Sequence, residues 1–193
     1  MNFKSLHFRW INLLLLRGSL QWAFVIVTLL TLIQPTTAFA ADLRVNTLDD
    51  ELNHDGDCSL REAITAANSN MAVDACPAGT GKLDTLRFKA TGTITLTTQL
   101  EVTGGGPLLI DGGSAITVSG GGSVRVLYVN LGTEVHLRSL TISRGFIEAI
   151  GGHGSGIYNA GTLTLTNSAL LSNRSPDSGG GIYNTGMLTL TSS

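Results

Sequence analysis

Charged and aromatic side chains are scarce in this sequence, at 13% and 6% of its 193 residues. With so few charges and a net charge of −2, the chain shows no basic footprint for nucleic acid. Apolar residues still make up 42% of the chain, which excludes a disordered protein, because disordered chains combine low hydrophobicity with high charge. The length is sufficient for one domain with a buried core.

The N-terminal region lacks acidic residues, although it contains the basic residues Lys4, Arg9 and Arg17. An apolar run of 12 residues follows at 22–33, and Ala38-Phe39-Ala40 has the A-x-A pattern of a cleavage site. A membrane anchor is the alternative, but a bilayer core of ~30 Å needs about 20 apolar residues. We therefore interpret residues 1–40 as a signal peptide. We expect a secreted or cell-surface protein, cleaved near Ala40, with no membrane span in the mature chain.

Cysteine is limited to Cys58 and Cys76. Export places both residues in an oxidising compartment, so a disulfide between them is expected. Closing that loop is worth on the order of 3 kcal/mol in the chain-entropy model. The alternative is a pair of buried free thiols.

A repeat dominates the second half of the chain. Residues 156–168 return as residues 181–193, with 10 of 13 positions identical. Leu alternates with Thr in both copies, which is the pattern of a strand with one buried face. Gly and Asn recur at matching positions, as tight corners require. Because such short strands cannot bury their apolar face alone, the period predicts stacked coils of a parallel β-solenoid.

Strands are expected throughout the chain after the signal peptide, starting at residues 42–48. The others are residues 85–88, 93–96, 108–110, 115–118, 124–129, 135–137, 140–142, 157–158, 163–165, 169–171, 182–183 and 188–190. Asn159 and Asn184 occupy equivalent positions in the repeat, so their amides are expected to stack as a ladder inside the solenoid. The chain ends within the second copy, so we expect incomplete repeats, from a longer protein or a truncated reading frame.

One helix is expected after the signal peptide, over residues 58–68. Ser59 and Glu62 fit the S-x-x-E capping box at its start, while Leu60, Ile64 and Ala67 share one face. The first coil of a solenoid exposes a strand edge and the open end of its core. We therefore predict an all-β fold, a single-stranded right-handed parallel β-helix with an N-terminal α-helical cap. Residues 41–82 form the capping segment and residues 83–193 the repeats.

An acidic turn precedes this helix. If Gly56 is the sixth position of a 12-residue loop, then Glu51, Asn53 and Asp55 fall at positions 1, 3 and 5, and Glu62 falls at position 12. Oxygen ligands at this spacing are typical of a calcium-binding loop. The alternative assigns Glu62 to the capping box and leaves the other acids in solvent. Calcium is the one cofactor that the sequence suggests.

Residues 55–64, Asp-Gly-Asp-Cys-Ser-Leu-Arg-Glu-Ala-Ile, and the following Ala66-Ala67-Asn68 closely resemble the CSLREA domain. Residues 74–79, Asp-Ala-Cys-Pro-Ala-Gly, also look like that family. The resemblance covers roughly residues 42–100 and implies a secreted bacterial protein in which right-handed parallel β-helix repeats follow. Residues 170–173 and 179–183 are similar to the repeats of polymorphic outer-membrane proteins and related adhesins, although Leu170 stands where those repeats favour Phe.

Three readings of function remain. The first is an exported, non-catalytic surface, adhesin-like or structural module, the N-terminal part of a longer protein, whose Thr- and Ser-rich outer faces contact carbohydrate or another cell-surface component. The alternative is the N-terminal part of a β-helix polysaccharide lyase or glycoside hydrolase, which rests on fold analogy alone. A truncated reading frame without function is the third. No catalytic residue is predicted, because the acids of the repeat region are scattered without a pair.

Overall fold

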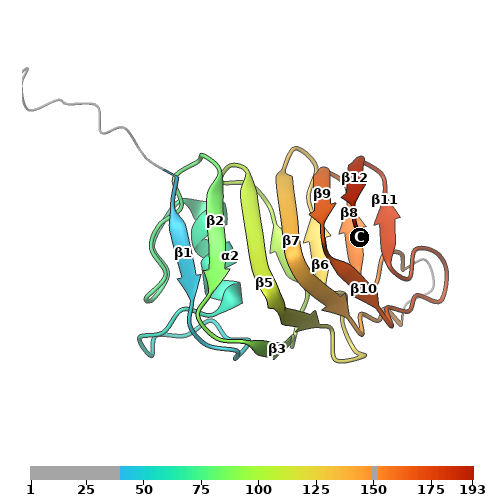
Figure 1. Cartoon of the computed structure of the whole chain (residues 1–193), viewed down its shortest axis with the longest axis horizontal. Coiled ribbons are helices and arrows are strands. Elements are labelled where there is room, and N and C mark those ends of the chain that lie inside the picture. Colours follow the sequence, from blue (N-terminus) through green and yellow to red (C-terminus); the bar gives the residue numbers. More distant parts are fainter. Residues whose placement is uncertain (1–39, 149–151) are drawn as a thin grey trace, which may run out of the picture. The chain divides into compact units, whose positions relative to one another are not determined.

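The structure is a computed structural model that describes residues 40–148 and 152–193. The predicted signal peptide therefore lies outside the described residues, except for Ala40. In the described part, twelve strands and one helix follow one another along the chain (Figure 1). They are β1 (Asp42–Val45), α2 (Leu60–Ser69), β2 (Asp84–Phe88), β3 (Gly92–Thr95), β4 (Leu100–Val102), β5 (Leu108–Ser119), β6 (Leu127–Val129), β7 (Glu134–Ser143), β8 (Ile157–Asn159), β9 (Thr162–Thr166), β10 (Ala169–Leu171), β11 (Ile182–Asn184) and β12 (Met187–Thr191).

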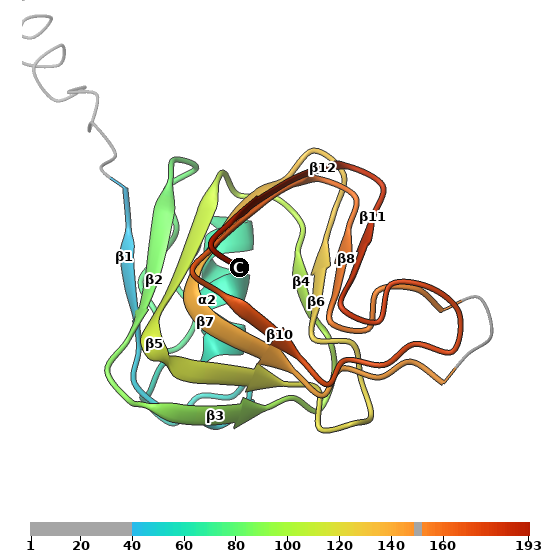
Figure 2. The same ribbon diagram turned by 45° about the vertical axis from the view of Figure 1, so that its right-hand side comes forward.

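All pairings between these strands are parallel, and they form three ladders around a common core (Figure 2). The first ladder runs from β1 and β2 through the first halves of β5 and β7 to β9 and β12. The second joins β3, the second halves of β5 and β7, and β10. The third contains β4, β6, β8 and β11. The fold is therefore a parallel β-solenoid, as the repeat predicted.

Inward side chains stack in columns along the solenoid. Leu163 and Leu188 of the two repeat copies are register partners, as are Ile157 and Ile182. One complete column of the first ladder consists of Leu43, Leu86, Ile110, Leu137, Leu165 and Leu190. The first five are buried, whereas Leu190 in the last turn is 54% exposed. Full burial of such a side chain contributes about 1.5–3 kcal/mol. The stacked columns thus form the continuous apolar core that a single short coil lacks.

The strand boundaries differ from the prediction at the corners. Residues 108–110 and 115–118 were expected as separate strands, but β5 is continuous, with a register shift between Asp111 and Ile116. The expected strands 135–137 and 140–142 are likewise joined in β7. At the corner between the two halves of β7 and in the turns that follow, Ser139, Asn167 and Ser192 adopt a left-handed conformation, with φ of 52°, 50° and 53°. A single residue at positive φ bends the chain while the ladder bonds on both sides continue.

Two further strand predictions were wrong. The strand expected at residues 124–129 is restricted to β6, and strand β4 was missed altogether. Leu100-Glu101-Val102 has the same alternation as the short strands that were predicted, with Leu100 and Val102 buried and Glu101 exposed. Its pairing with β6 of the next turn defines it as a strand.

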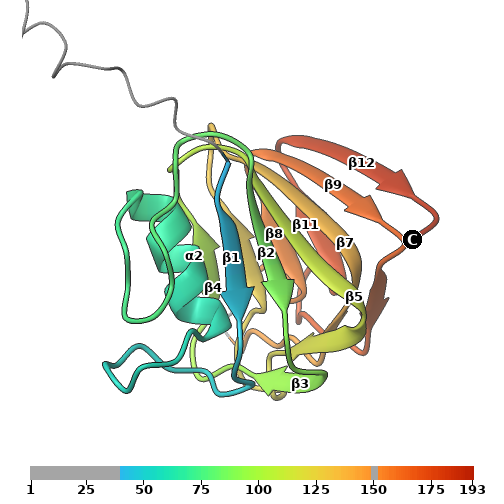
Figure 3. The ribbon, with the colours of Figure 1, turned by 60° about the vertical axis from the view of Figure 1, so that its left-hand side comes forward.

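Helix α2 contacts β1 and β4 beside the first turns of the solenoid (Figure 3). It starts two residues later than expected and ends at Ser69, followed by the C-cap residue Asn70 in the left-handed conformation with φ of 54°. Leu60, Ile64 and Ala67, the predicted apolar face, are all buried. That the helix closes the end of the core stays a prediction.

Candidate cation site in the acidic loop

The acidic loop between β1 and α2 is closed at its base by contacts around Cys58. Cys58 and Cys76 form the predicted disulfide, with their Cα atoms 5.0 Å apart. The amide of Cys58 donates to Asn46 Oδ1 at 2.8 Å, and the amide of Asn46 donates to the carbonyl of Cys58 at 3.0 Å. The loop is therefore tied both to strand β1 and to the segment that follows the helix.

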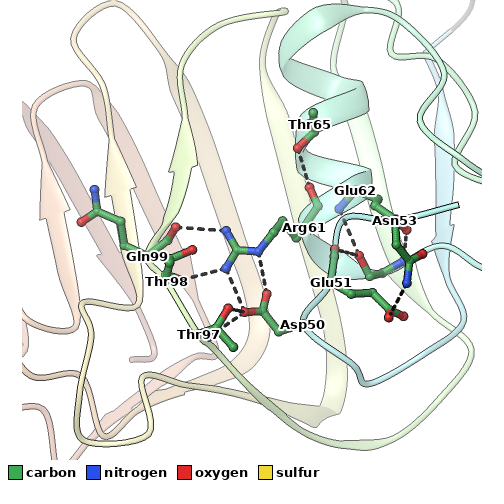
Figure 4. A network of polar contacts seen from close by, with 10 residues as sticks. Asp50, Glu51, Asn53, Arg61, Glu62, Thr65, Thr97, Thr98 and Gln99 are labelled. Atoms are coloured by element: carbon green, nitrogen blue, oxygen red, sulfur yellow. Dashed lines mark hydrogen bonds and ion pairs between the residues drawn. The ribbon is translucent and has the colours of Figure 1, made fainter.

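The contacts of Glu62 support the alternative in which it belongs to the helix capping box. Ser59 Oγ accepts the amide of Glu62 at 3.1 Å, and Glu62 Oε2 accepts the amide of Ser59 at 3.0 Å, which completes the capping box. Glu62 Oε1 accepts the amide of Asn53 at 3.0 Å (Figure 4). Both oxygens of this fully buried carboxylate thus bind backbone donors, which fixes the loop against the helix.

Two groups of carboxylates converge in the loop, each with oxygens within 4.8 Å of one another. Glu51 and Asp55, both predicted ligands, meet Asp57 in the first group, whereas Glu62 meets Asp57 and Asp74 in the second. The four predicted ligands therefore do not form one site. The loop pattern assigned no side chain to Asp57, and Asp74 lies beyond the helix. In the sequence, the predicted disulfide was the signal that Asp74 lies near Asp57, because it brings the neighbours of Cys58 and Cys76 together.

Asn53 occupies a different place from the one its loop position suggested. Its side-chain Nδ2 donates to Glu51 Oε2 at 2.8 Å and to Asp55 Oδ2 at 3.1 Å. A donor between these two carboxylates partly neutralises their repulsion. In this orientation only Asn53 Oδ1 is available as a ligand.

The electrostatics of the loop favour a cation. Burial and then repulsion from Asp55 and other nearby acids raise the pKa of both Glu51 and Asp57. Oδ1 of Asp57 is buried without a hydrogen-bond partner. A buried acceptor in that state is costly, and a bound cation would satisfy it while reducing the repulsion.

We predict that calcium binds this loop with a dissociation constant in the millimolar range or below. Titration of the protein with calcium chloride in a calorimeter should give a binding heat, and Asp57→Asn should weaken the affinity at least tenfold. Asp42→Asn, on the outer surface, is the matched control and should leave the affinity unchanged. The absence of heat up to millimolar calcium would contradict the prediction.

The predicted amide pair lies on the third ladder. Asn159 is fully buried, and its Nδ2 donates to Asn184 Oδ1 at 2.6 Å and to the carbonyl of Met187 at 2.8 Å. Its Oδ1 accepts the amide of Gly161 at 3.2 Å. Asn184 lies in the next turn and is exposed. The buried amide therefore carries most of this network.

Asn159→Leu is expected to reduce the free energy of unfolding by about 1–3 kcal/mol, because the carbonyl of Met187 and the amide of Gly161 lose their partner. Asn184→Leu should also destabilise, but less, since Asn159 retains two of its bonds. Urea unfolding measures both changes, with the exposed Thr189→Leu as control. An Asn159→Leu protein as stable as the unmodified one would rule out a stabilising amide ladder.

An outward column of aromatic rings, which the sequence analysis missed, follows the third ladder. Tyr128, Tyr158 and Tyr183 are register partners in β6, β8 and β11. The rings of Tyr128 and Tyr158 stack with centroids 4.8 Å apart, and Tyr183 lies 5.3 Å from Tyr158 and 4.4 Å from His153. The shared Gly-Ile-Tyr-Asn of the two repeat copies was a signal for part of this column.

Arg125 completes this column. Its guanidinium lies 5.4 Å and 5.3 Å from the ring centroids of Tyr128 and Tyr158 and donates to Gln99 Oε1 at 2.8 Å. It also donates to the carbonyls of His153 and Gly154. An open depression next to it is lined by Thr98, Gln99, Ser123, Val124, Arg125, Phe146, Ile147 and Glu148. We call Arg125, Tyr128, Tyr158 and Tyr183 the tyrosine strip.

Two acids of the repeat region contact basic neighbours. Arg138 donates to Asp111 at 2.6 Å, which lowers the pKa of Asp111 and raises that of Arg138. His136 lies 2.9 Å from Glu134 on the outer surface. In the range of the chain that the structure covers, no helix has the length and apolar character needed to cross a bilayer.

Comparisons of the sequence with protein-family models and curated proteins, and of the structure with solved structures, gave no match.

Proposed function

We propose that this chain is an exported, non-catalytic surface module that binds carbohydrate through the tyrosine strip. The single observation that carries the proposal is the alignment of three tyrosines and Arg125 on one outer face, over three turns. Tyr and Arg are enriched at the energetic centres of binding surfaces, since they combine apolar area with hydrogen-bonding groups. Stacking holds the rings in place, so little rotamer entropy is lost on binding.

Three other features support export and a surface role. The disulfide between Cys58 and Cys76 is typical of proteins in an oxidising compartment. Residues 55–64 resemble the CSLREA domain of secreted bacterial proteins. Outward threonines line up in register between β9 and β12, where Thr164 faces Thr189 and Thr166 faces Thr191, and they provide an uncharged, hydrogen-bonding surface on the first ladder.

The proposal is tested with the 193-residue chain expressed in a bacterial host that secretes through the general export route. The exported protein is applied to an array of polysaccharides, and the bound sugar is titrated by calorimetry. Arg125→Ala and Tyr158→Ala should weaken binding at least tenfold, whereas Thr189→Ala should not. Tyr158→Phe removes only the hydroxyl and keeps the stacked ring, so it distinguishes the contribution of the hydroxyl to binding from that of the aromatic surface. Thermal melts identify variants that lose binding through unfolding.

Retention of the chain in the cytoplasm, or export without binding to any polysaccharide on the array, would contradict the proposal. Release of oligosaccharides from a bound polysaccharide would instead favour the alternative, a polysaccharide lyase or glycoside hydrolase. Binding that survives both Arg125→Ala and Tyr158→Ala would move the carbohydrate site away from the tyrosine strip.

A further inference from the structure

Asp84 begins strand β2 at a position that is apolar in every later turn. Its successive register partners are Leu108, Val135, Leu163 and Leu188. Like the apolar residues at most of these positions, it is buried, with an exposed fraction of only 1%. A buried carboxylate is costly unless hydrogen bonds and a positive charge compensate it. The groups around Asp84 therefore show what compensates its charge.

Three donors surround this carboxylate. The amide and hydroxyl of Thr80 donate to Oδ2 at 2.9 Å and to Oδ1 at 2.6 Å. The backbone nitrogen of Ala41 donates to Oδ1 at 2.9 Å. Among residues 40–148 and 152–193, no Lys, Arg or His forms an ion pair with Asp84. Of these donors, only the nitrogen of Ala41 becomes charged if the chain is cut before it.

We infer that the bond between Ala40 and Ala41 is a processing site, and that its hydrolysis supplies the counter-charge of Asp84. A signal-type endopeptidase adds water across the bond, with the hydroxyl joining the carbonyl carbon of Ala40 and the hydrogen joining the nitrogen of Ala41. At neutral pH the new acid releases a proton and the new amine binds one. The resulting ammonium lies against the buried carboxylate. This inference rests on the proposed export.

The geometry around the bond suits both steps. Ala40 is exposed and Ala41 half-buried, so the bond lies where the chain enters the folded unit. The carbonyl of Ala41 accepts the amide of Thr85 at 2.8 Å, which holds Ala41 in the first ladder whether or not the bond is cut. The small residues of Ala38-Phe39-Ala40 match the requirement of a cleavage site. Because charged hydrogen bonds are stronger than neutral ones, the processed chain is more stable than its precursor.

The ion pair is tested on chains that begin at Ala41, since the described residues from Ala40 onward belong to one compact unit. Urea unfolding is measured with a free and an acetylated α-amino group, each with Asp84 and with Asp84→Asn. Acetylation should raise the unfolding equilibrium constant about tenfold with Asp84 and less than twofold with Asp84→Asn, because the cycle isolates the pair. Equal effects in both proteins would overturn the inference.

Two controls keep the test decisive. Asp42→Asn removes the next acid along the chain, on the outer surface, and should leave the tenfold effect of acetylation intact. If Asp84→Asn fails to fold, a chain that starts at Ala40 moves the ammonium by one residue while Asp84 remains. The unfolding equilibrium constant of this extended chain should be about tenfold higher than that of the chain starting at Ala41, and equal stabilities would overturn the inference.

N-terminal sequencing of the exported protein tests the processing site separately. Ala41 as the first residue supports the inference, and export with a different first residue overturns it while leaving the proposed function intact. A chain that is neither exported nor cut overturns both. Processed protein that binds no carbohydrate contradicts only the proposed function.

Discussion

Leu60→Ala is expected to lower the free energy of unfolding by about 3–5 kcal/mol, near the top of the range for buried leucines. Leu60, at the start of α2, is 1% exposed and lines a small apolar cavity together with residues of β4, β5, β6 and β7. The side chain thus reaches the interior that all three ladders share. Since a gap already exists there, the neighbours have little ability to fill the space that the substitution adds.

Urea unfolding measures this loss, and Leu131→Ala is the matched control. Leu131 is 84% exposed, so the same change of chemistry should cost no more than about 0.5 kcal/mol. Amide hydrogen exchange then tests whether the helix acts as a cap. Exchange in β2 and β4 of the first turn should increase more than in β9 and β12. A cost for Leu60→Ala below about 1 kcal/mol, or a uniform increase in exchange, would contradict the capping role.

Local sequence patterns were sufficient for features whose cause is local or strictly repeated. The alternation of Leu and Thr placed Leu163 over Leu188, because a repeat stacks in register with itself. The S-x-x-E pattern identified the capping box of α2, with Ser59 as the N-cap and Glu62 on the first turn, although the expected helix began at residue 58. The disulfide followed from there being only two cysteines. None of these predictions required knowledge of distant contacts.

Features that depend on contacts between different turns were missed. Asp74 meets Asp57 where the disulfide and the hydrogen bonds from Ala75 to Asp57 and from Gly56 to Asp74 join the two segments. The tyrosine strip includes Tyr128, which lies outside the recognisable repeat, and it exists because β6 pairs with β8. A charge at an inward position, as at Asp84, contradicts the apolar pattern and is explained only by the donors that surround it.

The contact between α2 and the first turn is a further example, and it predicts the second large effect. Arg61 Nε and Nη2 donate to Asp50 at 2.8 Å and 2.9 Å, and Nη2 and Nη1 donate to the carbonyls of Thr98 and Gln99 at 2.7 Å and 3.3 Å (Figure 4). The amide and hydroxyl of Thr97 also donate to Asp50. One ion pair thus joins the acidic loop, the helix and the segment between β3 and β4.

Asp50→Ala is expected to cost about 3–5 kcal/mol, because it leaves the guanidinium of Arg61 mostly buried without its counter-ion. The two side chains are only 2% and 17% exposed. Asp42→Ala is the matched control, since Asp42 pairs with Arg44 and Arg87 on the outer surface, where such pairs contribute about 0–1 kcal/mol. Equal costs for the two variants in urea unfolding would show that the buried pair does not stabilise the fold.

The pH dependence of this pair follows from the direction of its pKa shift. Burial raises the pKa of Asp50, but the hydrogen bonds from Arg61 and Thr97 together outweigh burial, so the pKa is lowered in the folded protein. The unfolded chain has the ordinary value of about 3.9 and therefore binds the proton more readily. The stability contributed by Asp50 is then complete above about pH 5 and is lost as the pH falls through the folded pKa. The difference in unfolding free energy between the unmodified protein and Asp50→Asn should accordingly stay constant from pH 7 to pH 5 and shrink below about pH 4. A difference that stays constant down to pH 2 would mean that the ionised carboxylate is not what holds the helix to the first turn.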